Sequence, residues 1–350
     1  MTTNGARVTR NCFGPGRVNL IGDHTDYNQG LALPMAIGLG VSVMFEERAE
    51  SWIELTSDAY PGERTTIPLD ITADTVAAWE PAWARLAAAV VSLARPGSGG
   101  RIHVGATLPR GSGLSSSAAL AVALADVLGV VGDALVIARL CQLAEHRIDV
   151  PVGLMDPLVC AGARAGHALL IDFASLDTLQ VPVPYGAEFT VVDSGQRRDL
   201  RTAAYATRVA ECEAAAAVIG PLGLATDADI LGLRDPLLRR RTRHVVAECI
   251  RVRAFAESLS IGDLGTAGQL MDESHRSLAV DFEATTPVVD ALVADLRSRP
   301  GVLGVRMTGA GFGGCVVALG EAGALEPSAL GTPAWLVVPS DGTVARRSPD

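Results

Sequence analysis

The segment from Arg101 to Cys141 constrains the fold of this chain more than any other. Apolar side chains alternate along Arg101–Leu108, as they do in a half-buried β-strand. A glycine- and serine-rich turn, Pro109–Ser117, follows, and an apolar run begins at Ala118. This run contains three charged residues, Asp126, Asp133 and Arg139. It therefore predicts a pair of buried helices and not a membrane span.

The turn between this strand and the helices is a candidate anion site. Gly111 and Gly113 allow the backbone N–H groups to converge, and Ser115–Ser117 lie where the helix should begin. Unpaired amides at a helix N-terminus bind phosphate. A serine-capped helix after a glycine turn gives the same pattern, so both interpretations stay open. A serine-hydrolase elbow is disfavoured because G-x-S-x-G needs glycine where Ser117 stands.

Lysine is missing from the sequence, and all 29 basic residues are arginine. A Walker-type phosphate loop and a lysine Schiff base are therefore excluded, because each needs a lysine side chain. The formal net charge of -10 argues against nucleic acid or an anionic membrane surface as the main partner. Nearly half of the residues are hydrophobic, which predicts a folded globular chain.

The six cysteines are scattered and include no C-x-x-C pair. This usage indicates free thiols in a reducing compartment, and neither a zinc site nor a disulfide framework. The first residues, Met1–Arg10, are polar and lack the apolar core of a secretory signal. We therefore expect a soluble, cytoplasmic protein with no membrane, nucleic-acid or obligate protein partner.

A second segment, Gly14–Gly30, concentrates hydrogen-bonding side chains between glycines. They are Arg17, Asn19, Asp23, His24, Asp26, Tyr27 and Asn28. Side chains of both charge signs at this density suit a polyhydroxylated ligand, and the alternative is a polar surface loop. An EF-hand is excluded, since Ile37 stands where a bidentate glutamate would be needed. A metal site on the two aspartates and the histidine lacks a convincing spacing.

A third segment, Met307–Cys315, contains the pattern G-x-G-x-G-G. A dinucleotide fingerprint must open a helix, whereas the residues that follow, Cys315–Leu319, predict a strand. We therefore expect a tight glycine turn between that strand and Leu303–Met307, where another backbone or a ligand comes close.

Further strands are predicted at Ala168–Phe173 and Phe189–Asp193, and helices at Tyr205–Ile219 and Arg239–Leu259. The proline-spaced Val181–Pro184 is the candidate domain boundary. Strands and helices on both sides of it predict an α+β enzyme of two domains. These would span residues 1–180 and 181–350.

Taken in order, the three segments resemble the motifs of galactokinases in the GHMP kinase superfamily. The matching patterns are the G-R-x-N-x-I-G-[DE]-H-x-D-Y signature, the G-L-S-S-S-A phosphate loop and the late G-x-G-x-G-G segment. The G-L-M-D run, Gly153–Asp156, with Gly166–Phe173 after it, resembles the family's catalytic-aspartate segment. The similarity runs from about Arg10 to about Leu319. It implies a two-domain fold with the active site in the cleft between the domains.

The resemblance also implies a reaction, in which the anomeric C1 hydroxyl of galactose attacks the γ-phosphate of ATP. The products would be galactose 1-phosphate and ADP. Asp156 would act as the general base, or at least as the carboxylate that orients the hydroxyl, with Arg17 beside it to stabilise charge on the phosphoryl group. Ser117 and Glu145 match the family's Mg²⁺ partners.

The remaining binding residues are assigned by the same resemblance. The matches to sugar contacts are Asp23, His24, Asp26, Gly153 and Tyr205. The matches to ATP contacts are Gly111, Ser112, Gly113, Leu114, Ser115, Ser116 and Ser117. Trp83 falls where the family has an adenine-stacking aromatic residue, although a core tryptophan would look the same.

Three departures from the family pattern concern substrate preference and Mg²⁺ geometry. Asp23 stands where most galactokinases have glutamate, Pro157 follows Asp156 where glutamine is usual, and the segment from Glu145 to Asp156 is one residue shorter. The alternatives are a kinase for another sugar, such as an N-acetylhexosamine, and a non-catalytic sugar-sensing relative. The intact Asp156 and Arg17 weigh against a sensor.

Overall fold

The first half of the chain forms a seven-stranded sheet in the computed structural model, which describes residues 8–109, 111–150, 152–196 and 203–347. Most of the polar segment Met1–Arg10 lies outside these ranges. The strands run in the order β4-β3-β5-β2-β6-β7, with β1 paired to β2. Their bounds are β1 Thr9–Ile21, β2 Leu31–Arg48, β3 Trp52–Ser57, β4 Arg64–Pro68, β5 Gly99–Ala106, β6 His167–Asp172 and β7 Thr178–Pro182.

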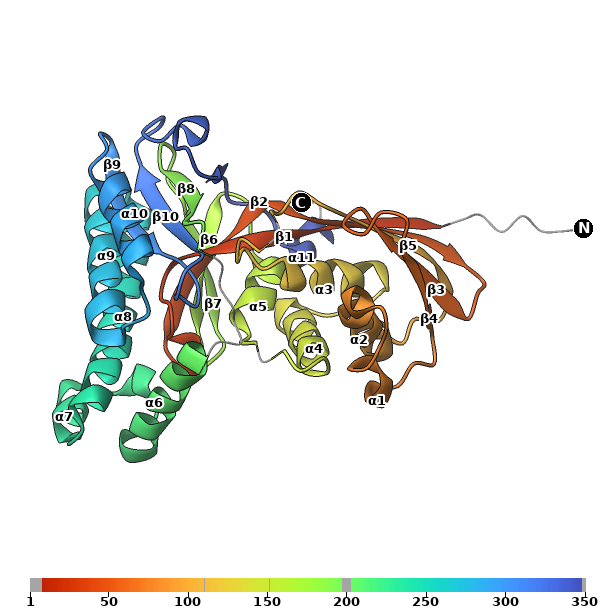
Figure 1. Ribbon diagram of the computed structural model, residues 1–350, viewed down its shortest axis with the longest axis horizontal. Coiled ribbons are helices and arrows are strands. Elements are labelled where there is room, and N and C mark those ends of the chain that lie inside the picture. The colour runs from red at the N-terminus through yellow and green to blue at the C-terminus, as the bar shows by residue number, and fades with distance from the viewer. Residues whose placement is uncertain (1–7, 110, 151, 197–202, 348–350) are drawn as a thin grey trace, which may run out of the picture.

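The first part of the Gly14–Gly30 segment belongs to β1, which forms a long antiparallel pair with β2 (Figure 1). Residues 14–21 are buried in β1, and only residues 22–30 connect the two strands. Even in this connection Asp23 and His24 are buried. The polar surface loop considered for this segment is therefore wrong.

Helices cover one face of this sheet (Figure 1). They are α1 Ala73–Val76, α2 Arg85–Ala94, α3 Ser116–Val127, α4 Ala134–His146 and α5 Met155–Gly162. The predicted helix pair is confirmed as α3 and α4. The chain breaks between them where Gly129 has a φ of 82°, and the Asp133 carboxylate caps α4 by accepting the Val136 N–H at 2.9 Å.

A glycine brings α3 into close contact with β1. A Cβ atom at Gly14 would lie 2.0 Å from the Ala119 carbonyl oxygen, so no larger residue fits there. At the end of this contact the Arg17 N–H donates to the Leu114 carbonyl at 3.1 Å. The contact therefore places the start of α3 beside the polar residues of β1.

The second half builds a four-stranded sheet in the order β11-β8-β10-β9. Its strands are β8 Glu188–Asp193, β9 Val302–Met307, β10 Cys315–Gly320 and β11 Ala334–Val337. The helices are α6 Ala203–Ile219, α7 Asp227–Gly232, α8 Pro236–Ile261, α9 Leu264–Ser277, α10 Pro287–Arg297 and α11 Thr343–Arg347. The predicted strands here are confirmed as β8, β9 and β10, and the predicted helices as α6 and α8.

The predicted boundary, Val181–Pro184, lies where the chain leaves the first sheet after β7 and approaches β8 of the second. The halves share contacts: α8 packs against β1, β2 and β7, and α11 returns to β1, α3 and α5. The α+β class is confirmed. The division into residues 1–180 and 181–350 stays a prediction.

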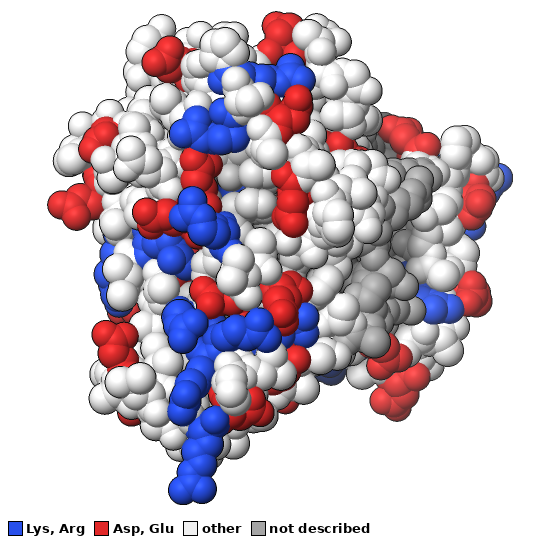
Figure 2. Space-filling view, turned by 60° about the vertical axis from the view of Figure 1, so that its left-hand side comes forward, with Lys and Arg blue, Asp and Glu red and all other residues white. Residues whose placement is uncertain are grey.

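The face that carries α8, α9 and α10 bears charges of both signs next to one another (Figure 2). Arg243 pairs with Asp281, and Arg297 with Asp272. Neighbouring charges of opposite sign cancel much of each other's field beyond a few ångströms. Within the described ranges, no helix is both long and apolar enough to cross a bilayer.

Candidate active site

The loop between β5 and α3 has the backbone of an anion site. Gly111 and Gly113 have φ values of 74° and 73°, and Ser115 also has a positive φ, 64°. Ser116 and Ser117 are exposed at the start of α3. Ser115 occupies the N-cap position, but its side chain makes no capping hydrogen bond. The first-turn amides of α3 are therefore not satisfied by this serine, contrary to the simple serine-cap interpretation.

The hydroxyl of Ser115 donates instead to the Asp156 carboxylate. Asp156 lies in the first turn of α5 and also receives two hydrogen bonds from Arg17, with Nε to Oδ1 at 2.6 Å and Nη2 to Oδ2 at 2.5 Å. The third guanidinium nitrogen, Nη1, donates to the Gly113 carbonyl at 2.8 Å. One arginine from β1 thus joins the serine loop to the predicted catalytic aspartate.

Glu145, in the last turn of α4, lies next to this cluster and is buried. Burial raises the pKa of its carboxyl group to about 7, and the charge of Asp156 adds to the effect, while the Ser117 hydroxyl and Arg17 oppose it. The two predicted Mg²⁺ partners, Ser117 and Glu145, are therefore hydrogen-bonded neighbours. A hydroxyl and a carboxylate are suitable ligands for this ion.

Several of the predicted sugar residues lie close to Asp156, whose charge acts on Asp26 and Tyr205. A Cβ atom at Gly153 would lie 2.5 Å from Asp26 Oδ2, so this glycine touches the carboxylate directly. Burial raises the pKa of Asp26 to about 6, with smaller contributions from the charges of Asp156 and Asp23. Burial also raises the pKa of Tyr205, whose hydroxyl is affected by Asp26 and Asp156.

His24 lies beside these residues with its ring stacked obliquely on Phe282, the two centroids being 4.4 Å apart. Its Nδ1 atom is 2.9 Å from the Tyr27 hydroxyl. Burial lowers the pKa of His24 to about 3, so the imidazole is neutral at physiological pH. A neutral ring can both donate and accept a hydrogen bond, as a sugar hydroxyl requires.

Asp23 belongs to a different environment. Its carboxylate forms an ion pair with Arg306 of β9, at 2.7 Å, and accepts the Gly309 N–H at 3.1 Å. The shorter side chain at this position therefore faces the glycine-rich third segment.

Three family models match the chain. The galactokinase galactose-binding signature matches residues 5–46, the GHMP kinase N-terminal domain residues 82–163, and the GHMP kinase C-terminal domain residues 252–326. The human galactokinase is 40% identical over 327 residues, which cover 89% of this chain and 83% of the relative. The chain belongs to the galactokinase family. The galactokinase of Chloroflexus aggregans is 39% identical over 335 residues, or 91% of this chain and 85% of the relative.

A solved structure supports the same family assignment. The crystal structure of Lactococcus lactis galactokinase complexed with galactose has a TM-score of 0.84 and 28% identity to this chain. It covers 95% of this chain, and the match takes in 94% of the solved chain. The GHMP kinase fold expected from the sequence is therefore confirmed.

Trp83, the predicted adenine-stacking residue of this galactokinase family member, lies near the β3–β4 turn. Its ring stacks on Tyr60 with centroids 5.0 Å apart, and its Nε1–H donates to Glu63 at 2.7 Å. The indole also packs against the core, partly buried. Its role toward adenine stays a prediction.

Sequence reasoning missed two residues beside the family motifs. Cys160 of α5 is buried next to Asp156 and Arg17, and this burial raises the pKa of its thiol. Arg306 is fully buried, although it lies in an apolar run predicted as a strand. A charged side chain inside a buried strand needs a partner of opposite charge. An arginine in an apolar run was therefore the sequence feature that could have predicted a buried ion pair here.

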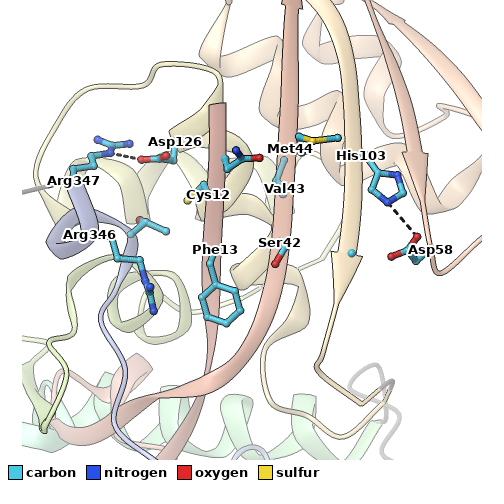
Figure 3. A pocket seen from close by; sticks show the side chains of 13 residues that line it. Cys12, Phe13, Ser42, Val43, Met44, Asp58, His103, Asp126, Arg346 and Arg347 are labelled. Atoms are coloured by element: carbon cyan, nitrogen blue, oxygen red, sulfur yellow. Dashed lines mark hydrogen bonds and ion pairs between the residues drawn. The ribbon is translucent and has the colours of Figure 1, made fainter. Parts of the chain in front are cut away.

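A hollow of about 850 Å³ lies on the outer face of the first sheet, between β1, β2, β5 and α11 (Figure 3). Arg346 covers the Phe13 ring there, at 5.0 Å from its centroid, and His103 pairs with Asp58. The residues that line this hollow include none of the predicted site residues. Among the described residues, no group of three or more His, Cys, Asp or Glu side chains is arranged to hold a metal by itself.

Proposed function

We propose that this chain transfers the γ-phosphoryl group of ATP to the anomeric hydroxyl of galactose, giving galactose 1-phosphate and ADP. One observation carries the proposal beyond family membership. The Asp156 carboxylate is bound at once by Ser115 of the predicted phosphate loop and by Arg17 of the sugar signature. Phosphoryl transfer has to take place where the phosphate site meets the sugar site, and a carboxylate at that point can act on the attacking hydroxyl.

The proposed roles follow from charge and position. Asp156 accepts the proton of the attacking hydroxyl, or orients that hydroxyl, while the new bond forms between sugar oxygen and γ-phosphorus and the bond to ADP breaks. Arg17 lies next to the reacting groups, where a guanidinium stabilises negative charge on the phosphoryl oxygens. The amides of the Gly111–Ser117 loop and the positive end of α3 bind the phosphates.

Mg²⁺ fits the residues present. Ser117 supplies a hydroxyl and Glu145 a carboxylate whose pKa burial raises to about 7, so that a cation bound beside it would favour the ionised form. A magnesium ion commonly takes one or two such protein ligands, together with substrate phosphates and water. When bound, it would neutralise charge on the phosphates; the two side chains would hold it against the start of α3.

On the sugar side, His24, Asp26, Gly153 and Tyr205 are proposed to bind galactose. The carboxylate, the phenol and the neutral imidazole supply acceptors and donors for hydroxyl groups, and glycine leaves room beside Asp26. The Lactococcus lactis relative was solved with galactose bound, which supports the same class of ligand here. We propose the cytoplasm as the location, because all six cysteines are free thiols, and no partner protein is needed for this reaction.

A coupled ADP-release assay tests the proposal with galactose, glucose and N-acetylgalactosamine at fixed MgATP. We expect galactose to give the highest kcat/KM, and Asp156→Asn to lower kcat by about 10² or more while galactose and MgATP still bind. Turnover only with another sugar would make the chain a kinase for that sugar. Sugar binding without any turnover would make it a sensor.

A further inference from the structure

The carboxylate of Asp23 already has three protein donors. Oδ1 accepts the Asn19 side-chain amide at 2.8 Å and the Gly309 N–H at 3.1 Å, and Oδ2 accepts a guanidinium N–H of Arg306 at 2.7 Å. The Asp23 side chain is 2% exposed. Asp156 also accepts three hydrogen bonds from the protein, but its side chain is 28% exposed. The Asp23 carboxylate is enclosed as well as charge-balanced, and has little surface left for a sugar hydroxyl.

Arg306 lies in β9, immediately before the glycine-rich third segment, and its side chain is completely buried. Besides Asp23, its guanidinium binds the Leu20 carbonyl at 3.1 Å and lies 3.7 Å from the Glu248 carboxylate. Burial opposes the ionisation of Glu248, but the charges of Arg251 and Arg306 hold its pKa at about 2. The planar guanidinium of Arg306 therefore binds both ends of the turn from Leu20 to Asp23, where β1 ends in the sugar signature.

This turn has a backbone conformation that needs support. Gly22 and His24 have φ values of 95° and 64°, and a left-handed conformation at a residue other than glycine persists only where the surroundings enforce it. The Gly22 N–H donates to Glu248 at 3.0 Å, and the Asp23 carbonyl lies 3.2 Å from His244 Nε2. The buried pair of Asp23 and Arg306 thus belongs to a network, together with the side chains of Glu248 and His244, that fixes this turn.

The same network reaches the phosphate loop through the third segment. The Thr308 hydroxyl donates to the Asn19 carbonyl at 2.8 Å, next to the sugar signature. The Cys315 thiol lies 3.1 Å from the Ser112 carbonyl of the serine loop. The ion pair therefore lies where the sugar-signature turn contacts the glycine segment. The glycine segment in turn contacts the phosphate loop.

We propose that Arg306 is a positioning residue for phosphoryl transfer, with Asp23 as its buried counter-ion and not as a sugar ligand. This inference rests on the proposed kinase activity. The ion pair fixes the sugar-binding turn against the glycine segment, so that the acceptor hydroxyl and the γ-phosphate keep their relative position. A displacement of about 1 Å between reacting groups can cost about 10²-fold in rate.

Two conservative variants test this role. Asp23→Asn keeps the shape of the side chain and removes its charge, whereas Arg306→Lys keeps the charge and removes the fork. Arg299→Lys is the matched control, because Arg299 forms an exposed pair with Asp295 at 3.0 Å on the same half of the protein. For each protein, kcat, the KM values for galactose and MgATP, and kcat/KM for a set of monodeoxygalactoses are measured well below the unfolding temperature.

We expect Asp23→Asn and Arg306→Lys to lower kcat about tenfold or more with every sugar, while the control stays at wild-type values. The ratio of kcat/KM between galactose and each deoxy sugar should stay within about threefold of wild type, because no hydroxyl contact is lost. Should Asp23→Asn fail to fold, Arg306→Lys still gives the comparison, since it keeps the ion pair.

Two results would overturn the inference. A change of about tenfold or more in the ratio for one deoxy sugar with Asp23→Asn would make Asp23 a ligand of that hydroxyl. A lower unfolding temperature with unchanged kcat in both variants would make the pair purely structural. Failure of the proposed function is a separate result, because it is seen in the wild-type protein, which then releases no ADP with galactose.

Discussion

Replacing Asp26 by asparagine should stabilise the folded protein at neutral pH while impairing its sugar site. Burial raises the pKa of Asp26 from 3.8 to about 6. The folded chain therefore holds this proton more tightly than the unfolded chain does, and the ionised carboxylate destabilises the folded state. The penalty is absent below about pH 3.8 and is complete above about pH 6. It corresponds to about 3 kcal/mol at most.

The introduced amide is neutral at every pH, so the advantage of Asp26→Asn should grow as the pH rises from 4 to 7. With an unfolding entropy of about 2.1 cal/mol/K per residue, a penalty of this size corresponds to about 4 °C in Tm for this chain. Differential scanning calorimetry from pH 4.5 to 8, without sugar or nucleotide, measures the effect, with the exposed Asp70→Asn as control. An equal Tm difference at pH 5 and pH 8, or a wild type more stable than the variant at pH 8, would refute the reasoning. The KM for galactose should rise in the same variant.

Four further substitutions probe the rest of the site. Gly153→Ala would bring a Cβ within 2.5 Å of Asp26 Oδ2 and should raise KM for galactose with KM for ATP unchanged. Ser117→Ala should weaken MgATP binding in calorimetry, because it removes the hydroxyl proposed to hold Mg²⁺; unchanged affinity would contradict its assignment. Trp83→Ala should raise KM for ATP if the indole stacks on adenine, and a loss of stability alone would assign it to the core. Arg17→Lys should lower kcat by about 10² or more, because an ammonium group cannot reproduce the fork, and near-normal turnover would exclude that role.

Much of the fold follows from local patterns, because long apolar runs with one period leave few alternatives. The helices α3 and α4 were predicted from one apolar run, and the strands that flank the glycine segment from two short ones. The helices α6 and α8 were predicted from Ala, Arg and Glu mixed among apolar residues. The strand β1 was not, because glycine, proline and polar side chains interrupt its alternation. Its extended conformation depends on pairing with β2 along almost its whole length, which is a property of the assembled sheet.

The partners of the charged site residues could not be predicted in the same way. Arg306 stands 283 residues after Asp23 in the chain, and their ion pair exists only because the Arg306 side chain reaches the end of β1, where it also binds the Leu20 carbonyl. A match to a family motif identifies Asp23 as a polar residue of the sugar signature, but does not reveal what balances its charge. That requires the three-dimensional arrangement.

The serine loop shows most clearly why a local sequence can fit two functions. A conventional cap by Ser115 would contribute about 1 kcal/mol to α3, and a left-handed backbone at a residue other than glycine costs about 1–2 kcal/mol. Against both stands one hydrogen bond to the charged Asp156, worth about 1.5–3 kcal/mol. These contributions nearly cancel, so stability alone does not select this arrangement over a capped helix. This arrangement leaves the first amides of α3 uncapped by the Ser115 side chain and ties the loop to a carboxylate 41 residues further along the chain. Asp156, the residue that decides between a serine-capped helix and a phosphate loop, thus lies outside the serine motif itself.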